Sequence, residues 1–159
     1  MNTLALDLGL TAGFASRLDG LFDSGTVSLE VGRDESKGLR PMRLGNFLAR
    51  VNALCRGGLD LVVFEQVHHR GGAATAVAER FVGKLLEFCA LEGIDHKPVH
   101  TATLKKWATG KGNAGKPEMM AEARRRHPEV DLIDDNHADA LLLLDYALAE
   151  LVPAGAGSE

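Results

Sequence analysis

Three acidic residues lie at the ends of apolar segments of the chain. Asp7 follows a short apolar run, Glu65 closes a second one, and Asp139 lies near the start of a hydrophobic segment. A carboxylate at such a place is costly unless it is paired, and a bound cation is one common partner. Oxygen ligands without sulfur favour Mg²⁺ or Mn²⁺. Two such ions about 3.5–4 Å apart can activate a water and stabilise the leaving oxygen in phosphodiester hydrolysis.

Each of these residues also has a structural explanation when it is considered alone. Asp7 is consistent with an ordinary turn, and Asp139 with a salt-bridged helix residue. Asp134 or Asp135 is a suitable residue type to cap the helix that follows. The hypothesis of a metal centre therefore depends on the three carboxylates occurring together, on elements that bring them to one place.

Hydrophobic patterning predicts the elements that would position the carboxylates. Short apolar runs and the turn pair Asp19-Gly20 indicate strands, and apolar residues at helical spacing indicate helices. Thr101 is a typical helix N-cap residue, and Pro117 suits the first turn of the next helix. The expected strands are Thr3–Leu8, Ala12–Leu18, Leu21–Leu29, Leu59–Phe64 and Ile94–Val99, and the expected helices are Leu39–Leu54, Ala73–Leu91, Thr101–Ala108, Pro117–Arg126 and Asn136–Leu151.

This order of elements predicts an α/β fold. We expect one mixed sheet, with three antiparallel strands followed by parallel strands, flanked by helices. If the first and fourth strands are parallel neighbours, Asp7 and Glu65 lie side by side at their carboxyl ends, and the terminal helix brings Asp139 to them. We expect a single domain over residues 1–152 and a disordered tail over residues 153–159.

The composition is that of an ordinary globular domain. The chain has 159 residues, 45% of them hydrophobic and 25% charged, and its apolar runs fall short of the roughly 20 residues that cross a bilayer. Its first residues lack the pattern of a secretion signal. Cys55 and Cys89 lie in apolar stretches without a CxxC motif, so we expect reduced core residues in a cytoplasmic protein and no zinc site.

The net charge of −4 conceals a basic stretch between Lys105 and His127. Seven basic residues there stand against Glu118 and Glu122, so the stretch carries about +5 and the rest of the chain about −9. A basic strip beside an acidic centre is typical of a phosphate-binding surface, although a solvated helix face would also explain the last three residues. The seven are Lys105, Lys106, Lys111, Lys116, Arg124, Arg125 and Arg126.

Four segments of the chain together resemble the RuvC-type Holliday-junction resolvases, especially those of bacteriophages, within the RNase H-like superfamily. Asp7–Ala15 resembles their first motif, and Val62–Val67 resembles the strand that ends in Glu-Gln. Thr109–Lys116 is similar to their glycine-rich loop that closes on a lysine, and Asp135–Leu141 to the acidic entry of their last helix. Order and spacing agree from residue 1 to about residue 150.

The resemblance implies an RNase H-like fold and a homodimer that resolves four-way DNA junctions by paired, symmetric nicks. Asp7, Glu65 and Asp139 would bind two Mg²⁺ ions, with Mn²⁺ able to substitute, and the cuts would leave 5′-phosphate and 3′-hydroxyl ends. Lys116 would stabilise charge on the scissile phosphate, a role that a lysine after a glycine-rich loop can also take on chemical grounds. The helix Ala73–Leu91 is our candidate dimer interface, although its apolar face is equally consistent with core. The cell would be bacterial or phage-infected, with an organelle matrix as an alternative.

The fourth carboxylate departs from the family pattern. Many relatives have their last two aspartates three residues apart, which would place one at Asn136, whereas here Asp135 precedes Asp139 by four. Positions three and four residues apart share a helix face, so we favour Asp135 as the fourth catalytic and metal-binding residue. Asn136 and His137 are the rivals, and His137 would point away from the others on a regular helix.

A second departure follows the strand that ends in Glu65. Relatives carry an aromatic residue there that is thought to contact bases, whereas this chain has His68, His69 and Arg70. Histidine can stack on bases and arginine can bind phosphate, so we expect DNA contacts from these three. We expect further phosphate contacts from Lys105, Lys106, Lys111 and Lys116, and we expect Trp107 to pack rather than to bind DNA.

Three alternative functions remain open at this point. An RNase H-like nuclease acting on flaps, forks or RNA–DNA hybrids would use the same metal chemistry. An actin/Hsp70-type nucleotide-binding protein also starts with Asp-x-Gly-x-Thr, but its cleft needs two lobes and this length supplies one. A catalytically silent DNA-binding relative is disfavoured by the complete set of carboxylates and by Lys116.

Overall fold

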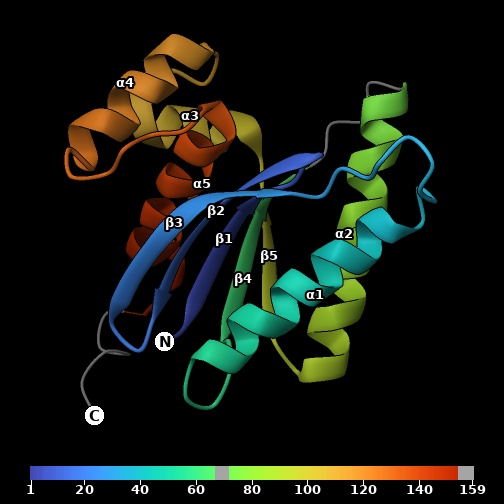
Figure 1. The fold of residues 1–159 in the computed structure, drawn as a ribbon. Coiled ribbons are helices and arrows are strands. Elements are labelled where there is room, and N and C mark those ends of the chain that lie inside the picture. The colour runs from blue at the N-terminus through green and yellow to red at the C-terminus, as the bar shows by residue number, and fades with distance from the viewer. Residues whose placement is uncertain (67–71, 154–159) are drawn as a thin grey trace.

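The computed structural model describes residues 1–66 and 72–153, and these form one sheet covered by helices on both faces (Figure 1). The sheet has five strands in the order β3-β2-β1-β4-β5. Antiparallel pairing joins β1 to β2 and β2 to β3, and parallel pairing joins β1 to β4 and β4 to β5. The strands are β1 (Thr3–Asp7), β2 (Thr11–Leu18), β3 (Leu21–Ser28), β4 (Leu61–Glu65) and β5 (Asp95–Val99). The predicted mixed α/β sheet is confirmed.

The helices form two layers. In Figure 1, α1 and α2 cover one face of the sheet, and α3, α4 and α5 lie on the other. The last helix ends in a wider π-helical turn over Ala147–Leu151, where the sequence predicted a continuous α-helix. The α-helices are α1 (Leu39–Leu54), α2 (Ala73–Glu92), α3 (Thr101–Thr109), α4 (Lys116–Arg126) and α5 (Asp135–Tyr146).

Alternation along the central strands divides the core into two clusters. Leu4 and Leu6 of β1 pack with the residues of α1 and α2, while Ala5 between them faces α5. In β4, Val62 and Phe64 join the first cluster and Val63 joins the second. Because side chains alternate between the faces of a strand, a short apolar strand contributes to both layers.

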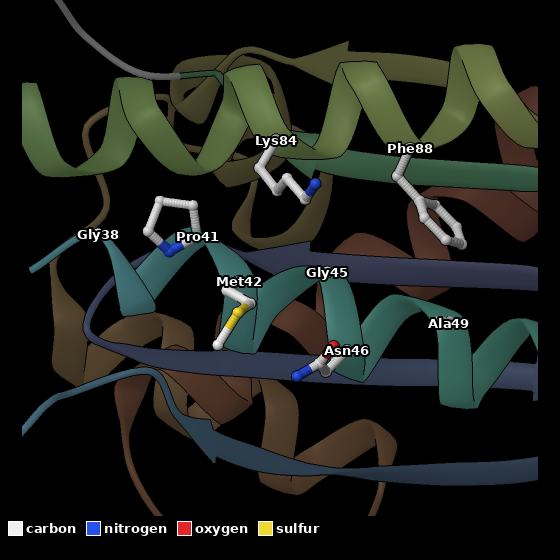
Figure 2. Close-up of a pocket in the computed structure, with 8 residues that line it drawn as sticks. All are labelled: Gly38, Pro41, Met42, Gly45, Asn46, Ala49, Lys84 and Phe88. Atoms are coloured by element: carbon white, nitrogen blue, oxygen red, sulfur yellow. The ribbon is translucent and has the colours of Figure 1, made fainter. Parts of the chain in front are cut away.

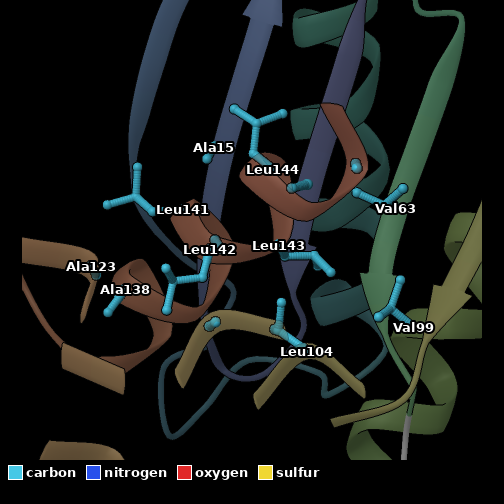
Figure 3. Packing of buried hydrophobic residues seen from close by; sticks show 14 of the residues in the cluster. Ala15, Val63, Val99, Leu104, Ala123, Ala138, Leu141, Leu142, Leu143 and Leu144 are labelled. Atoms are coloured by element: carbon cyan, nitrogen blue, oxygen red, sulfur yellow. The ribbon is translucent and has the colours of Figure 1, made fainter. Parts of the chain in front are cut away.

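The small side chains under α5 let that helix approach the sheet closely. Ala5 and Ala15 are paired across β1 and β2, and both are fully buried. The helix itself is buried on several sides, since α3 and α4 cover it from the outside, and Figure 3 shows Leu141, Leu142, Leu143 and Leu144 packed between the layers. A helix that is apolar nearly all round is one that lies inside the protein.

The β2–β3 hairpin has the turn that its sequence predicts. Asp19 and Gly20 have φ angles of 49° and 81°, and positive φ at both central residues is characteristic of a type I′ turn. Asn2 stabilises this turn, because its Oδ1 accepts a hydrogen bond from the Asp19 backbone N–H at 2.8 Å. The Asn2 Nδ2 donates to the carbonyl oxygens of Arg56 and Gly58 at 3.3 and 2.9 Å, so one side chain ties the hairpin to the loop before β4.

Several expectations about single residues can be compared with the structure. Cys55 and Cys89 are free and buried, as predicted. Leu91, the last residue of the predicted helix, is 78% exposed, because the core-facing stripe of α2 runs through Phe81, Leu85 and Cys89. Trp107 packs against Tyr146, with ring centroids 5.6 Å apart, which confirms its expected packing role. None of the helices in the described ranges is long and apolar enough to cross a membrane.

Candidate active site

The carboxyl ends of β1 and β4 lie next to each other in the centre of the sheet. The parallel register pairs Leu6 with Phe64, so Asp7 and Glu65 follow side by side at the same edge. This neighbourhood confirms the expectation drawn from the apolar runs. Asp7 is also the antiparallel partner of Gly13, which places β2 immediately on its other side.

The first turn of α5 brings two further aspartates to this edge. Asp134 is the N-cap, and its Oδ1 accepts from the His137 backbone N–H at 2.8 Å, which fixes where the helix begins. Asp135 is then the first helical residue, and Asp139 lies about one turn later. α5 packs on β1 and β2, so its N-terminal turn reaches the end of β1.

The electrostatics of the cluster show that its carboxylates are close to one another. Burial, and after it the negative charges of Glu65, Asp139 and Asp135 in that order, raises the pKa of Asp7 to about 8. Burial also raises the pKa of Asp139 to about 7, with Glu65 and Asp135 contributing in the same direction. Desolvation and like-charge repulsion both disfavour the ionised form, and at Asp139 they outweigh the opposing charges of Lys105 and Lys116. The positive charge near the cluster therefore does not balance its carboxylates.

A divalent cation fits this deficit in charge. The donors are carboxylate oxygens, which suit Mg²⁺ or Mn²⁺. Within the described ranges, however, no three Asp, Glu, His or Cys side chains are arranged as a ready-made metal site. Asp135 is paired with Lys116, so a cation held by all four carboxylates would require their side chains to turn toward it. The chemistry of the donors fits a divalent cation.

Lys116 occupies the position next to this cluster that the sequence predicted. Its Nζ forms a salt bridge with Asp135 Oδ2, although the Lys116 side chain is 79% exposed. The hydrogen bond to Asp135 raises the pKa of Lys116, and the same bond lowers the pKa of Asp135. The backbone at Lys116 is fixed by its neighbours: Glu118 Oε2 accepts from the Gly115 backbone N–H at 2.8 Å at the start of α4. Because the backbone is fixed at the start of α4, the Lys116 side chain can turn from a carboxylate to a phosphate oxygen by rotation about its own bonds.

The three candidates for the fourth site residue differ in what they contact. His137 is 2% exposed, and its ring lies between the Ile133 backbone N–H and the Ser24 hydroxyl, away from the carboxylates. The expectation that it points away is therefore confirmed, but it is a buried residue and not a surface one. Asn136 contacts Gly13 through its backbone. Asp135 is the candidate whose charge acts on both Asp7 and Asp139.

Thr101 is a site residue whose role sequence reasoning missed. The N-cap of α3 is His100, with no side-chain hydrogen bond, so the predicted capping role of Thr101 is wrong. Its Oγ1 instead donates a hydrogen bond to Glu65 Oε1. A hydroxyl residue two positions after β5, the strand that neighbours β4, was the available signal, because that position lies beside the end of β4.

The predicted DNA-contacting residues fall into groups with different surroundings. Lys105 lies close enough to Asp139 to oppose the rise in its pKa. Lys111 pairs with Glu118 at 3.4 Å and is largely exposed, and Lys106 is also exposed. His68, His69 and Arg70 lie outside the described residues, so their predicted contacts stay predictions.

Two of the three arginines of the basic stretch are engaged within the protein. Arg125 and Arg126 both bond to Glu122, at 2.7 Å, within α4. The Arg126 guanidinium also lies over the Trp107 ring, 4.4 Å from its centroid, and donates to the Ala108 carbonyl oxygen. Arg126 therefore stabilises the packing of α4 against α3, whereas Arg124 is exposed.

Comparison with known proteins identifies the fold. The sequence matches no protein-family model and no curated protein sequence. Among solved structures, the chain is similar to RuvC of Thermus thermophilus, with a TM-score of 0.71 and 18% identity over 94% of this chain and 96% of that one. It is also similar to T. thermophilus RuvC in complex with a Holliday junction substrate, with a TM-score of 0.73 and 18% identity over 90% of each chain. The chain thus has the RuvC fold, an RNase H-like α/β architecture.

Proposed function

We propose that this protein is a metal-dependent endonuclease that resolves four-way DNA junctions by paired, symmetric nicking. The observation that carries the proposal is the convergence of Asp7, Glu65 and Asp139 at one sheet edge of a RuvC fold, with Lys116 beside them. Asp7 and Asp139 are half-buried and mutually repelling, which is costly in a purely structural role. A bound divalent cation would offset this unfavourable free energy, so the arrangement is consistent with a site for a cation and a phosphate.

Each residue then has a distinct task. Asp7, Glu65 and Asp139, with Asp135 as the fourth, would hold Mg²⁺, and Mn²⁺ could substitute. Two bound ions would supply an activated water and would offset charge on the leaving oxygen. The Lys116 ammonium, which is paired with Asp135 in the structure, would face a non-bridging oxygen of the scissile phosphate. Thr101 keeps Glu65 in one orientation throughout.

The shared fold supports four-way junctions as the proposed substrate. The T. thermophilus RuvC of the second comparison was solved with a Holliday junction. Lys105, which lies near Asp139, and the exposed Lys106 and Lys111 would supply phosphate contacts that depend on salt and not on sequence. A nuclease that accepts flaps and forks equally is the second candidate, because it would use the same site.

Symmetric cutting requires two active sites, and we propose a homodimer formed through α2 and the adjoining part of α1. Figure 2 shows the groove between these helices, where Lys84 and Phe88 point from α2 toward α1. Its volume is about 460 Å³, and Met42, on its rim, is 51% exposed. Leu86 and Leu91 of α2 are also exposed, so an apolar surface remains although the inner face of α2 is core.

The proposal is tested by cleavage of labelled synthetic DNA. A four-way junction, a flap, a fork and a linear duplex are compared in Mg²⁺ and in EDTA, and the ends of the products are mapped. Symmetric nicks in the junction alone, dependent on Mg²⁺ and bearing 5′-phosphates, are the expected result. Equal cutting of flaps and forks would favour the broader nuclease, and no cleavage in Mg²⁺ or Mn²⁺ would contradict the proposal.

A further inference from the structure

We infer that Gly13, Ser24 and His137 are positioning residues that hold the first turn of α5 against β2 and β3, and so set where Asp135 and Asp139 lie relative to Asp7. The inference rests on the proposed function, since it concerns the same carboxylates. None of the three touches the reacting groups. They are called the α5 anchor below.

Gly13 gives the anchor its close contact. A Cβ atom built on Gly13 would lie 1.9 Å from the carbonyl oxygen of Asn136, 2.3 Å from its carbonyl carbon and 2.9 Å from the His137 nitrogen. All three are backbone atoms, so no change of rotamer relieves the overlap. The φ angle of Gly13 is not positive, so the glycine is needed for space and not for backbone conformation.

The contact is linked to the catalytic edge by the sheet register. Gly13 is the partner of Asp7 across β1 and β2, and Asn136 stands between Asp135 and His137 at the start of α5. One point of contact therefore joins the strand that pairs with Asp7 to the helical turn that carries the other aspartates. Because a helix moves as a rigid element, any displacement at Asn136 is passed on to Asp139.

The His137 ring links the start of α5 to β3. The Ile133 backbone N–H donates to its Nδ1 at 3.2 Å, which leaves the ring proton on Nε2 in the neutral tautomer. Nε2 lies 2.9 Å from Ser24 Oγ, so it donates to that hydroxyl on β3. The ring is buried between the two partners, so it ties the segment before α5 to the outer strand of the sheet.

The size of the expected displacement follows from contact distances. Non-bonded heavy atoms need about 3.5 Å between them, so a methyl group at Gly13 must push the start of α5 outward by about 1.5 Å. Metal–ligand distances tolerate only about 0.2 Å, and a misplacement of about 1 Å can cost about 100-fold in rate. A single methyl group, added outside the carboxylate cluster, is therefore expected to impair metal binding.

The test compares Gly13→Ala with Gly25→Ala, which adds its methyl group to the opposite face of the same sheet, on the side of α1 and α2. A Cβ at Gly25 meets only the Phe14 ring, at 3.2 Å, and that ring can turn aside. Mn²⁺ affinity is measured by electron paramagnetic resonance without DNA, and junction binding and cleavage are measured separately. We expect Gly13→Ala to lower Mn²⁺ affinity at least about 10-fold and cleavage at least about 100-fold, with junction binding in Ca²⁺ within about threefold.

A milder pair of variants covers the case in which Gly13→Ala does not fold. Ser24→Ala removes the acceptor of the buried His137 N–H, and Ser24→Thr retains a hydroxyl. We expect Ser24→Ala to weaken Mn²⁺ binding about 10-fold and Ser24→Thr to restore it. Unchanged Mn²⁺ affinity in folded Gly13→Ala, or in Ser24→Ala, would overturn the inference. A parent protein that binds Mn²⁺ but cuts no DNA would instead refute the proposed function. In that case the Mn²⁺ affinities of the Gly13 and Ser24 variants would still test the α5 anchor.

Discussion

Thr101 Oγ1 donates a hydrogen bond to Glu65 Oε1, which joins the first residue of α3 to the last residue of β4. The two residues are 36 positions apart in the chain, and β5 lies between them in the sequence. With one carboxylate oxygen occupied by the hydroxyl, the other is left for a cation. Groups that orient a ligand in this way contribute to metal affinity although they do not touch the metal.

Removing this hydroxyl should weaken the metal site. Thr101→Val keeps the shape of the side chain but leaves Glu65 free to rotate, so we expect Mn²⁺ affinity and the cleavage rate to fall about 10- to 100-fold. Thr101→Ser retains the donor and should stay near the parent. Calorimetric Mn²⁺ titration of the three proteins checks this, and equal affinities for parent and Thr101→Val would show that the hydrogen bond does not orient Glu65.

Lys116 should act on the chemical step more than on binding. Lys116→Ala is expected to lower the rate at saturating junction about 100- to 1000-fold, because a charge that meets the transition state is lost. Lys111→Ala is the matched control, since Lys111 lies in the same loop and pairs with Glu118. Its loss should change the salt dependence of binding and leave the saturated rate nearly unaltered. Equal effects of both variants on that rate would argue against a special role for Lys116.

The metal-free protein should lose stability as the pH rises. The folded pKa values of Asp7 and Asp139, about 8 and about 7, lie above their ordinary value of 3.8. Groups with raised pKa values contribute fully below about pH 4, and their contribution disappears as the pH passes through 7 and 8. We expect Tm in EDTA to be lower at pH 9 than at pH 5, and the difference to shrink in Asp7→Asn. Identical pH profiles for the two proteins would contradict the raised pKa of Asp7.

The features that could be predicted from the sequence are those that depend on residues close together in the chain. Alternation and helical spacing are local, so the strands, the helices and the meeting of Asp7 with Glu65 were predictable. The Thr101–Glu65 and His137–Ser24 contacts join residues far apart in the chain, and their geometry depends on the sheet order and on the depth at which α5 packs. The need for glycine at position 13 has the same origin, because it arises from the Asn136 backbone and not from the conformation of the strand.

A variant far from the site should separate stability from function. Asn2→Ala removes the side-chain bonds to Asp19, Arg56 and Gly58 and leaves these partly buried backbone groups without their partner. We expect a loss of about 2–3 kcal/mol in the free energy of unfolding, measured by urea denaturation. Mn²⁺ affinity at low temperature should match that of the parent. A loss of metal affinity as large as that of Thr101→Val would mean that the site responds to general destabilisation.

The most direct measurement is cleavage of a four-way junction in Mg²⁺ by the parent protein and by Asp7→Asn, with junction binding in Ca²⁺ measured beside it. Asn retains the size of the side chain and removes its negative charge at the centre of the carboxylate cluster. We expect paired nicks from the parent, a rate at least about 1000-fold lower from the variant, and binding within about threefold. Full cleavage by Asp7→Asn would contradict a metal centre built on Asp7, Glu65 and Asp139.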